Sequence, residues 1–160
     1  MKIGMAVSEV HDAEAALVEE MLRVGERHKA DHDVYHLTRT LAQKGRERMK
    51  ALEPHAERYD VKLGGDPGDG GSVLSTLREK GSELAGRRPE TGLLLLRDVR
   101  KLHLLVAEAS IDWTMLGQGA QAARDVELLA TVSECHPEVL RALKWTTTKL
   151  KESSPQVLTS

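Results

Sequence analysis

Residues 102–136, LHLLVAEASIDWTMLGQGAQAARDVELLATVSECH, decide the fold class, because they contain the end of one helical pattern, a short break and the start of a second pattern. Apolar residues in the first part recur at steps of three and four, which places them on one face of an α-helix. The second part resumes the same rhythm after only a few residues. A break this short predicts two helices that pack side by side as an antiparallel hairpin.

Both patterns extend beyond this stretch. The first predicts a seam of Leu95, Val99, Leu102, Val106, Ala109, Trp113 and Leu116. The second predicts a seam of Ala122, Val126, Leu129, Ser133, His136, Leu140, Leu143, Thr147 and Leu150. Polar residues interrupt the second seam at Ser133, His136 and Thr147. We expect Pro137 to bend the second helix and Pro155 to end it, since proline removes a backbone donor.

The N-terminal half predicts another hairpin. Its first helix is expected over residues 8–28, with Ser8 as the N-cap and with Val10, Ala13, Leu17, Met21 and Val24 on one face. Its second helix is expected to begin after Asp31, with Pro54 as a kink or an early end. The stripe of this helix is Val34, Leu37, Leu41, Gly45, Met49, Leu52, Ala56 and Tyr59.

Three histidines surround the predicted turn, in residues 27–36, RHKADHDVYH. A turn at residues 29–31 separates His28 from the other two, so we expect His28 to close the apolar face of the first helix. His32 and His36 point away from the stripe of their helix, toward solvent or a partner subunit. A turn with an exposed face is the expected arrangement. The alternative is an adventitious or intersubunit metal site, with His32 and His36 as a zinc or nickel pair.

Residues 60–90 separate the two hairpins and include the glycine-rich run 64–71, GGDPGDGG. We expect a flexible connection with a short helix over 72–85, and no phosphate-binding loop, because the Gly-Lys-Ser/Thr ending is missing. Such a connection is long enough to span a bundle. The 160 residues therefore predict a single all-α domain over 1–160, an antiparallel four-helix bundle with a long crossover between its second and third helices.

Composition excludes several classes of protein. The net charge is −2 with both signs mixed along the chain, and two Trp and two Tyr are the only aromatic residues, so we expect no nucleic-acid partner. No apolar run approaches 18 residues, which excludes a membrane span. A single cysteine, Cys135, and a start without a signal-peptide core predict a cytoplasmic protein. We expect Cys135 itself to serve in packing.

The organisation of the four helices, and the hairpin 102–136 in particular, resembles the ferritin-like superfamily. That resemblance implies two metal ions in the bundle centre, held by a glutamate from each of two helices and by Glu-x-x-His on each of the other two. This chain has no Glu-x-x-His; the nearest match is Asp33-x-x-His36, and Ser133 precedes His136 where the family has glutamate. Glu108 resembles the lone glutamate of the family, although its helical angle places it on the flank.

The polar residues near the seams allow two interpretations of the bundle centre. In the first, Arg48 donates to Glu14, and Ser133 and His136 complete a buried polar layer that replaces a metal site. Arg48 could instead extend along the bundle to water, which is the alternative to this first interpretation. In the second, iron or manganese binds a non-standard ligand set. That set is Glu14, Glu20, Asp98, Glu108 and His136, within which Glu20 and Asp98, together with His28, form a candidate mononuclear site.

The leading functional hypothesis is a non-catalytic bundle that acts as a binding or structural module, without catalytic or cofactor-binding residues. The alternative is a metal-binding ferritin-like oxidoreductase or metal-handling protein. A module of the first kind is expected to form a homodimer or another homo-oligomer, through the His32 and His36 face or through the leucine run 93–96.

Overall fold

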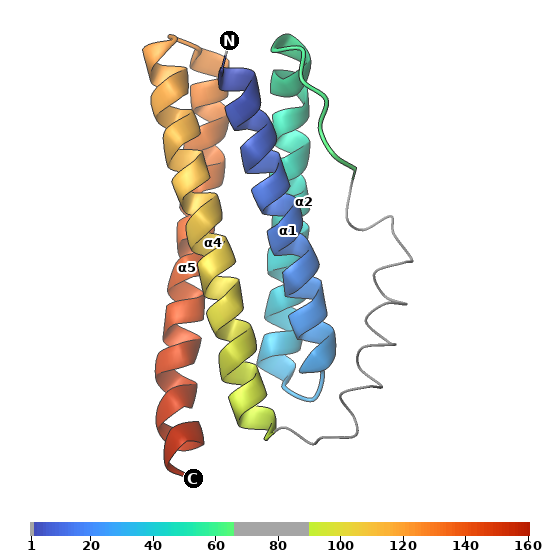
Figure 1. Cartoon of the computed structure of the whole chain (residues 1–160), viewed down its shortest axis with the longest axis vertical. Helices are drawn as coiled ribbons and strands as arrows, with labels where there is room; N and C mark the ends of the chain where they lie inside the picture. Colours follow the sequence, from blue (N-terminus) through green and yellow to red (C-terminus); the bar gives the residue numbers. More distant parts are fainter. Residues whose placement is uncertain (1, 66–89) are drawn as a thin grey trace.

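The computed structural model describes residues 2–65 and 90–160, and these are all-α (Figure 1). The helices are α1 (Ile3–Arg27), α2 (His32–Arg58), α4 (Thr91–Ala122) and α5 (Val126–Thr159). No strand occurs in the described ranges, which confirms the all-α prediction. The expected short helix over 72–85 and the glycine-rich run beyond Gly65 lie outside the described residues.

The four helices lie along one another as two hairpins (Figure 1). A turn at residues 28–31 joins α1 to α2, and a turn at residues 123–125 joins α4 to α5. Beyond these hairpins, α1 packs extensively on α4, whereas α2 touches α5 only lightly. In Figure 1 α1 starts at the upper end and α2 returns to it, while α4 starts at the lower end and α5 returns there.

The predicted turn between α1 and α2 is confirmed in its details. The backbone N–H of His28 donates to the carbonyl of Val24 and closes α1. Asp31 is the N-cap of α2, and its carboxylate accepts a 3.2 Å hydrogen bond from the N–H of Val34. A capping carboxylate satisfies one of the free donors at a helix start, which explains why α2 begins here.

Two predicted helix boundaries were wrong. Ser8 lies inside α1, which begins at Ile3, because Val7 on the first turns belongs to the buried core. Pro155 lies inside α5, which continues to Thr159. A proline removes a single backbone hydrogen bond, and α5 continues through both Pro137 and Pro155. α2 likewise contains Pro54.

The core confirms most of the seam predicted for α4. Val99, Leu102, Val106, Ala109, Trp113 and Leu116 are buried, whereas Leu95 is only half-buried. The seam predicted for α5 was wrong by one residue. Its buried face is Leu128, Val132, Cys135, Val139, Ala142 and Thr146, while Val126 and Leu140 are exposed. Both stripes have the same three-and-four spacing, so periodicity could not separate them; the observed stripe carries fewer polar interruptions.

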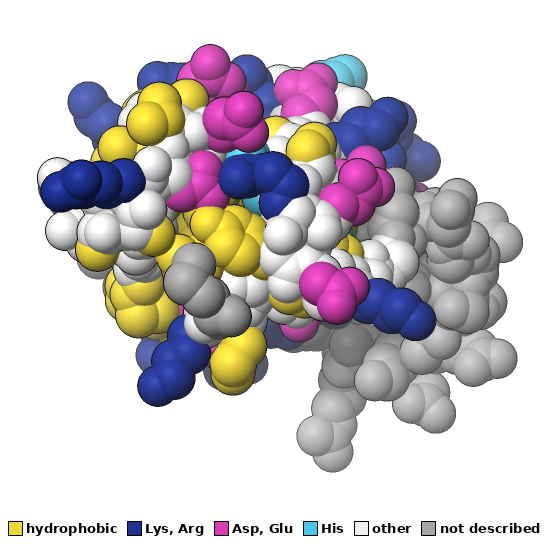
Figure 2. All heavy atoms as spheres, turned by 90° about the horizontal axis from the view of Figure 1, so that it is seen from above, with side chains coloured by type: hydrophobic (Ala, Val, Ile, Leu, Met, Phe, Trp, Pro, Cys, Tyr) yellow, Lys and Arg dark blue, Asp and Glu magenta, His cyan; other side chains and the backbone are white. Residues whose placement is uncertain are grey.

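Some large hydrophobic side chains remain exposed. Figure 2 looks onto the end where α1 begins, and hydrophobic side chains lie at the surface there among charged ones. The exposed set is Met5, Leu93, Leu104, Ile111, Met115, Val126, Leu140 and Leu158. Within residues 2–65 and 90–160, no helix combines the length and the hydropathy that a bilayer crossing requires.

Candidate functional site

A buried ion pair joins α1 to α2 in the middle of the bundle. Arg48 Nε donates to Glu14 Oε1 at 2.7 Å, and Arg48 Nη2 donates to Glu14 Oε2 at 2.9 Å. The two bonds form the parallel arrangement in which a guanidinium and a carboxylate match best. Glu14 is 0% exposed and Arg48 is 4% exposed. The structure therefore brings together the first two residues of the predicted polar layer.

The other two helices also contribute to this ion pair. Trp113 of α4 donates its indole N–H to Glu14 Oε1 at 2.8 Å. Arg48 Nη1 reaches Glu138 of α5, with 3.2 Å between the nitrogen and Oε2. One residue from each helix thus takes part in a single polar network, which we call the central network: Glu14, Arg48, Trp113 and Glu138.

Electrostatics keep the guanidinium of this network charged. Burial alone would lower the pKa of Arg48, but hydrogen bonds and charge from Glu14, followed by those from Glu138, outweigh it and raise that pKa. Glu14 Oε1 already accepts from both Arg48 and Trp113. The network therefore neutralises a buried carboxylate with a permanent protein cation.

Two residues predicted for this layer lie elsewhere, which corrects that part of the prediction. Ser133 is exposed and donates to the carbonyl of Leu129. His136 is half-buried, with its Nε2 3.0 Å from Ser110 Oγ. The cause is the one-residue shift of the α5 seam, which rotates both side chains away from the centre. Burial lowers the pKa of His136, which favours its neutral imidazole.

A second charged cluster ties α1 to α4 near the α1–α2 turn. Asp98 accepts hydrogen bonds from His28 Nε2 at 2.8 Å and from Arg27 Nη1 at 3.1 Å. Glu20 pairs with Arg23, and Lys101 Nζ lies 3.2 Å from Glu20 Oε2. Arg23 also reaches Asp98, so the two carboxylates share one guanidinium. We call this set the turn cluster: Glu20, Arg23, Arg27, His28, Asp98 and Lys101.

Cations determine the ionisation of the turn cluster. Burial would raise the pKa of Asp98, but the hydrogen bond from His28 and the charges of Arg27 and Arg23 lower it overall. Burial opposes ionisation of Glu20 as well, and hydrogen bonds and charge from Arg23, then Lys101, lower its pKa. A metal ion at Glu20 and Asp98 would lie against three protein cations, so the predicted mononuclear site is not supported.

The five candidate ligands for iron or manganese do not converge. Glu14 belongs to the central network, Glu20 and Asp98 belong to the turn cluster, and Glu108 is exposed. His136 bonds Ser110 instead. Across the described ranges, no group of three or more His, Cys, Asp or Glu side chains is arranged to hold a metal ion. The non-standard ligand set predicted from the sequence is thereby corrected.

His32 and His36 lie on the exposed face of α2, as predicted. Their rings stack with 5.7 Å between centroids, and the ring of Tyr35 meets that of His36 edge-on. Two imidazoles at this spacing supply two ligands, fewer than the three or four of zinc sites in proteins. Within one chain the two stacked rings therefore lack the further ligands of a structural zinc site.

A third network closes the opposite end of the molecule. Asp125 is the N-cap of α5, accepting from the N–H of Leu128, and it also accepts from Arg58 at 3.0 Å and from the Tyr59 hydroxyl at 2.5 Å. Arg58 further donates to His55 Nδ1. The end of α2 is thereby fastened to the start of α5, where the two helices otherwise touch lightly.

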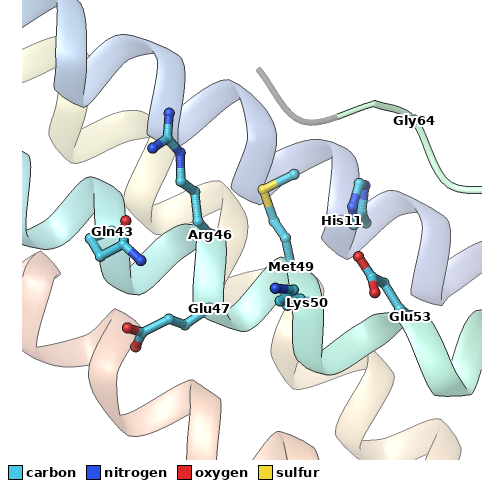
Figure 3. Close-up of a pocket in the computed structure, with 8 residues that line it drawn as sticks. All are labelled: His11, Gln43, Arg46, Glu47, Met49, Lys50, Glu53 and Gly64. Atoms are coloured by element: carbon cyan, nitrogen blue, oxygen red, sulfur yellow. The ribbon is translucent and has the colours of Figure 1, made fainter. Parts of the chain in front are cut away.

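A surface pocket of about 310 Å³ lies between α1, α2 and the segment that follows α2 (Figure 3). It is lined by His11 of α1, by Gln43, Arg46, Glu47, Met49, Lys50 and Glu53 of α2, and by Gly64. Charges of both signs line it, with Arg46 and Lys50 alongside Glu47 and Glu53. This mixed lining selects no particular class of ligand.

Sequence reasoning missed Trp113 and Glu138 as partners of the central network. Trp113 left a usable signal, since a buried indole N–H requires an acceptor and Glu14 was already expected inside. Glu138 left no signal, because its role depends on the register of α5. No family model, no curated protein and no solved structure matches this chain.

Proposed function

We propose that this chain is a non-catalytic member of the ferritin-like kind, an antiparallel four-helix bundle with a long crossover between α2 and α4. Its role is that of a binding or structural module that associates with further copies of itself. The arrangement in Figure 1 supports the topology, because α2 ends at the upper end and α4 begins at the lower one. Each short turn joins helices that run in opposite directions.

The central network carries the functional part of this proposal. Catalytic bundles of this type use inward carboxylates to bind two metal ions. Here the fully buried carboxylate, Glu14, has a guanidinium as its counter-ion. A buried carboxylate needs one positive charge nearby, and Arg48 supplies it from within the chain. The centre of the bundle then has a structural role.

The exposed apolar residues support a role in association. Leu104, Ile111 and Met115 are 52%, 60% and 53% exposed and lie on α4. The leucine run 93–96, one of the two contacts predicted from the sequence, supports it less, because only Leu93 of the four is exposed. The single cysteine, Cys135, is free and buried, and it suits the cytoplasmic location that we propose.

Oxidation of ferrous iron under air tests the non-catalytic role. Untagged protein is mixed with about two equivalents of ferrous iron per chain, the number that a dinuclear site takes up. We expect the oxidation rate of protein-free buffer. Faster oxidation that is lost in Glu14→Gln would contradict the proposal, because it would place chemistry at the central network. Arg141→Met, on the exposed face of α5, is the matched control.

A further inference from the structure

One face of α4 points out of the molecule along most of the helix. We call it the outer stripe and define it as Leu93, Arg97, Arg100, Leu104, Glu108, Ile111 and Met115, all of which are exposed. Leu93, Leu104 and Met115 recur every 11 residues, close to three whole turns, so they follow a nearly straight line on the helix. The packing partners of α4 among the described helices, α1 and α5, leave this line uncovered.

The outer stripe is symmetric in spacing and complementary in charge. Its residues follow one another at steps of four, three and four on either side of Leu104. Arginines occupy the N-terminal arm, at Arg97 and Arg100, while the C-terminal arm carries Glu108. Arg100 and Glu108 take part in no ion pair among residues 2–65 and 90–160, so both charges are available to a partner.

We propose that the outer stripe pairs with the outer stripe of a second copy, antiparallel, about a two-fold axis at Leu104. In this register Leu104 meets Leu104 of the second copy, and Arg100 meets its Glu108. Leu93 meets Met115 of the second copy, and the aliphatic stem of Arg97 covers its Ile111. By symmetry each contact away from the axis occurs twice. The proposal rests on the self-association in the proposed function and specifies its surface.

Other pairings of the same stripe are electrostatically worse. A parallel arrangement places Arg100 against Arg100 and Glu108 against Glu108. An antiparallel arrangement centred on Arg100 or on Glu108 places like charges on the axis itself. The axis at Leu104 alone combines an apolar centre with two opposite-charge contacts. The charge pattern of the stripe therefore selects both the direction and the register of the pairing.

The size of the stripe determines how strong the association is. Twenty-two steps along an α-helix cover about 33 Å. A stripe about 33 Å long and about one helix diameter, roughly 10 Å, wide covers about 330 Å², which is less than the roughly 800 Å² that each partner contributes to a standard stable interface. We therefore expect a reversible dimer that responds to protein concentration, instead of a permanent one.

Charge reversal tests the register. Sedimentation velocity is measured on the full chain from about 1 µM to about 1 mM, the range of weak association. We expect wild type to self-associate, and Arg100→Glu or Glu108→Arg to raise the dissociation constant at least about tenfold by creating two like-charge contacts. The double variant restores the association, and Arg141→Glu leaves it unchanged. Single variants that associate like wild type, or wild type that stays monomeric at about 1 mM, would overturn the proposal.

Engineered cysteines test the symmetry independently. Leu104→Cys is expected to form a covalent dimer under mild oxidation, because only a residue on the axis faces its own copy. Ile111→Cys is not, since the two copies of position 111 lie about 21 Å apart along the helix axes. Cys135 is buried and stays in place in both variants. Equal cross-linking at both positions indicates parallel helices and would overturn the register.

Different results would contradict the proposed function and the pairing through the outer stripe. A dimer that is unaffected by charge reversal and does not cross-link at position 104 must use another surface. That result would contradict the proposed pairing and would still agree with a self-associating module. Rapid iron oxidation removes the non-catalytic role and leaves pairing through α4 intact.

Discussion

Arg48 and Glu14 lie 34 positions apart in the sequence and meet through two nearly parallel hydrogen bonds, with all but a trace of both side chains hidden from water. Arg48→Met removes the cation and leaves the carboxylate of Glu14 uncompensated inside the bundle. We expect a loss of about 3–5 kcal/mol in the free energy of unfolding, which is typical of a broken buried pair. Urea denaturation followed by circular dichroism measures it.

A second variant separates charge from packing in the same experiment. Glu14→Gln combined with Arg48→Met removes both charges, so the double variant is expected to be more stable than Arg48→Met alone. Arg141→Met, at an exposed position, is expected to stay within about 0.5 kcal/mol of wild type. Equal losses in Arg48→Met and Arg141→Met would mean that the pair contributes nothing.

Gly45 allows α1 and α2 to approach closely. A Cβ at this position would lie 2.6 Å from Val18 Cγ2, well inside van der Waals contact. Gly45→Ala is therefore expected to destabilise the protein by about 1–3 kcal/mol, although alanine is the better helix former. Gly119→Ala is the matched control, because its Cβ would meet nothing nearer than 3.9 Å. For Gly119→Ala we expect the free energy of unfolding to rise by about 0.5–1 kcal/mol. A change of the free energy of unfolding in the same direction in both variants would contradict this explanation.

Asp98 makes stability depend on pH in the acid range. Its pKa in the folded chain lies below the ordinary 3.8, so ionised Asp98 stabilises the fold at neutral pH. That contribution is lost as pH falls through the lowered folded pKa. We expect the free energy of unfolding to fall on acidification below about pH 5, and less steeply in Asp98→Asn. Parallel pH profiles of the two proteins would count against the turn cluster as the cause.

Asp112 is expected to act with the opposite sign. Burial, then the negative charges of Glu108 and Glu9, raise its pKa above the ordinary value of 3.8. An ionised Asp112 therefore opposes folding at neutral pH, and the penalty disappears as pH falls below its folded pKa. We expect Asp112→Asn to raise the midpoint of thermal unfolding at pH 7 and to lose this advantage in acid. A lower midpoint at pH 7 would disprove the assignment.

Cys135 is expected to be unreactive in the folded chain. Burial raises the pKa of its thiol to about 11, so almost no thiolate exists at pH 8. Labelling with a thiol reagent should follow the rate of unfolding and become rapid in urea. Leu104→Cys provides an exposed thiol for comparison. Immediate labelling of wild type without denaturant would show that Cys135 is accessible.

The two C-terminal helices show where periodicity suffices for prediction and where it does not. On α4 a single apolar stripe was predicted from Leu95 to Leu116, and every member of it from Val99 onward is buried. On α5 two adjacent stripes have the same spacing, and the predicted one was displaced by a residue. The burial of Leu128 and Val132 depends on the register against other helices, which the spacing of apolar residues along one helix does not encode.

The same distinction applies to the central network. Glu14 and Arg48 could be paired from the sequence because both fall on core-facing stripes of helices joined by a four-residue turn, so their depths are linked. Ser133 and His136 were placed through the displaced α5 stripe and so were misplaced. In the turn cluster, the inward positions of Glu20 and Asp98 were predicted. Their arginine partners reach in from the flank of α1, where long side chains carry charge into half-buried space.

Elemental analysis by plasma mass spectrometry tests most directly whether a protein cation has taken the place of metal in the bundle centre. Untagged protein is purified without chelator, incubated with ferrous iron under air and desalted. We expect less than about a tenth of an equivalent of iron or manganese per chain, because Arg48 already neutralises Glu14, and Glu20 and Asp98 are paired with cations of the turn cluster. About two tightly held equivalents per chain would contradict it, since that is the content of a dinuclear centre.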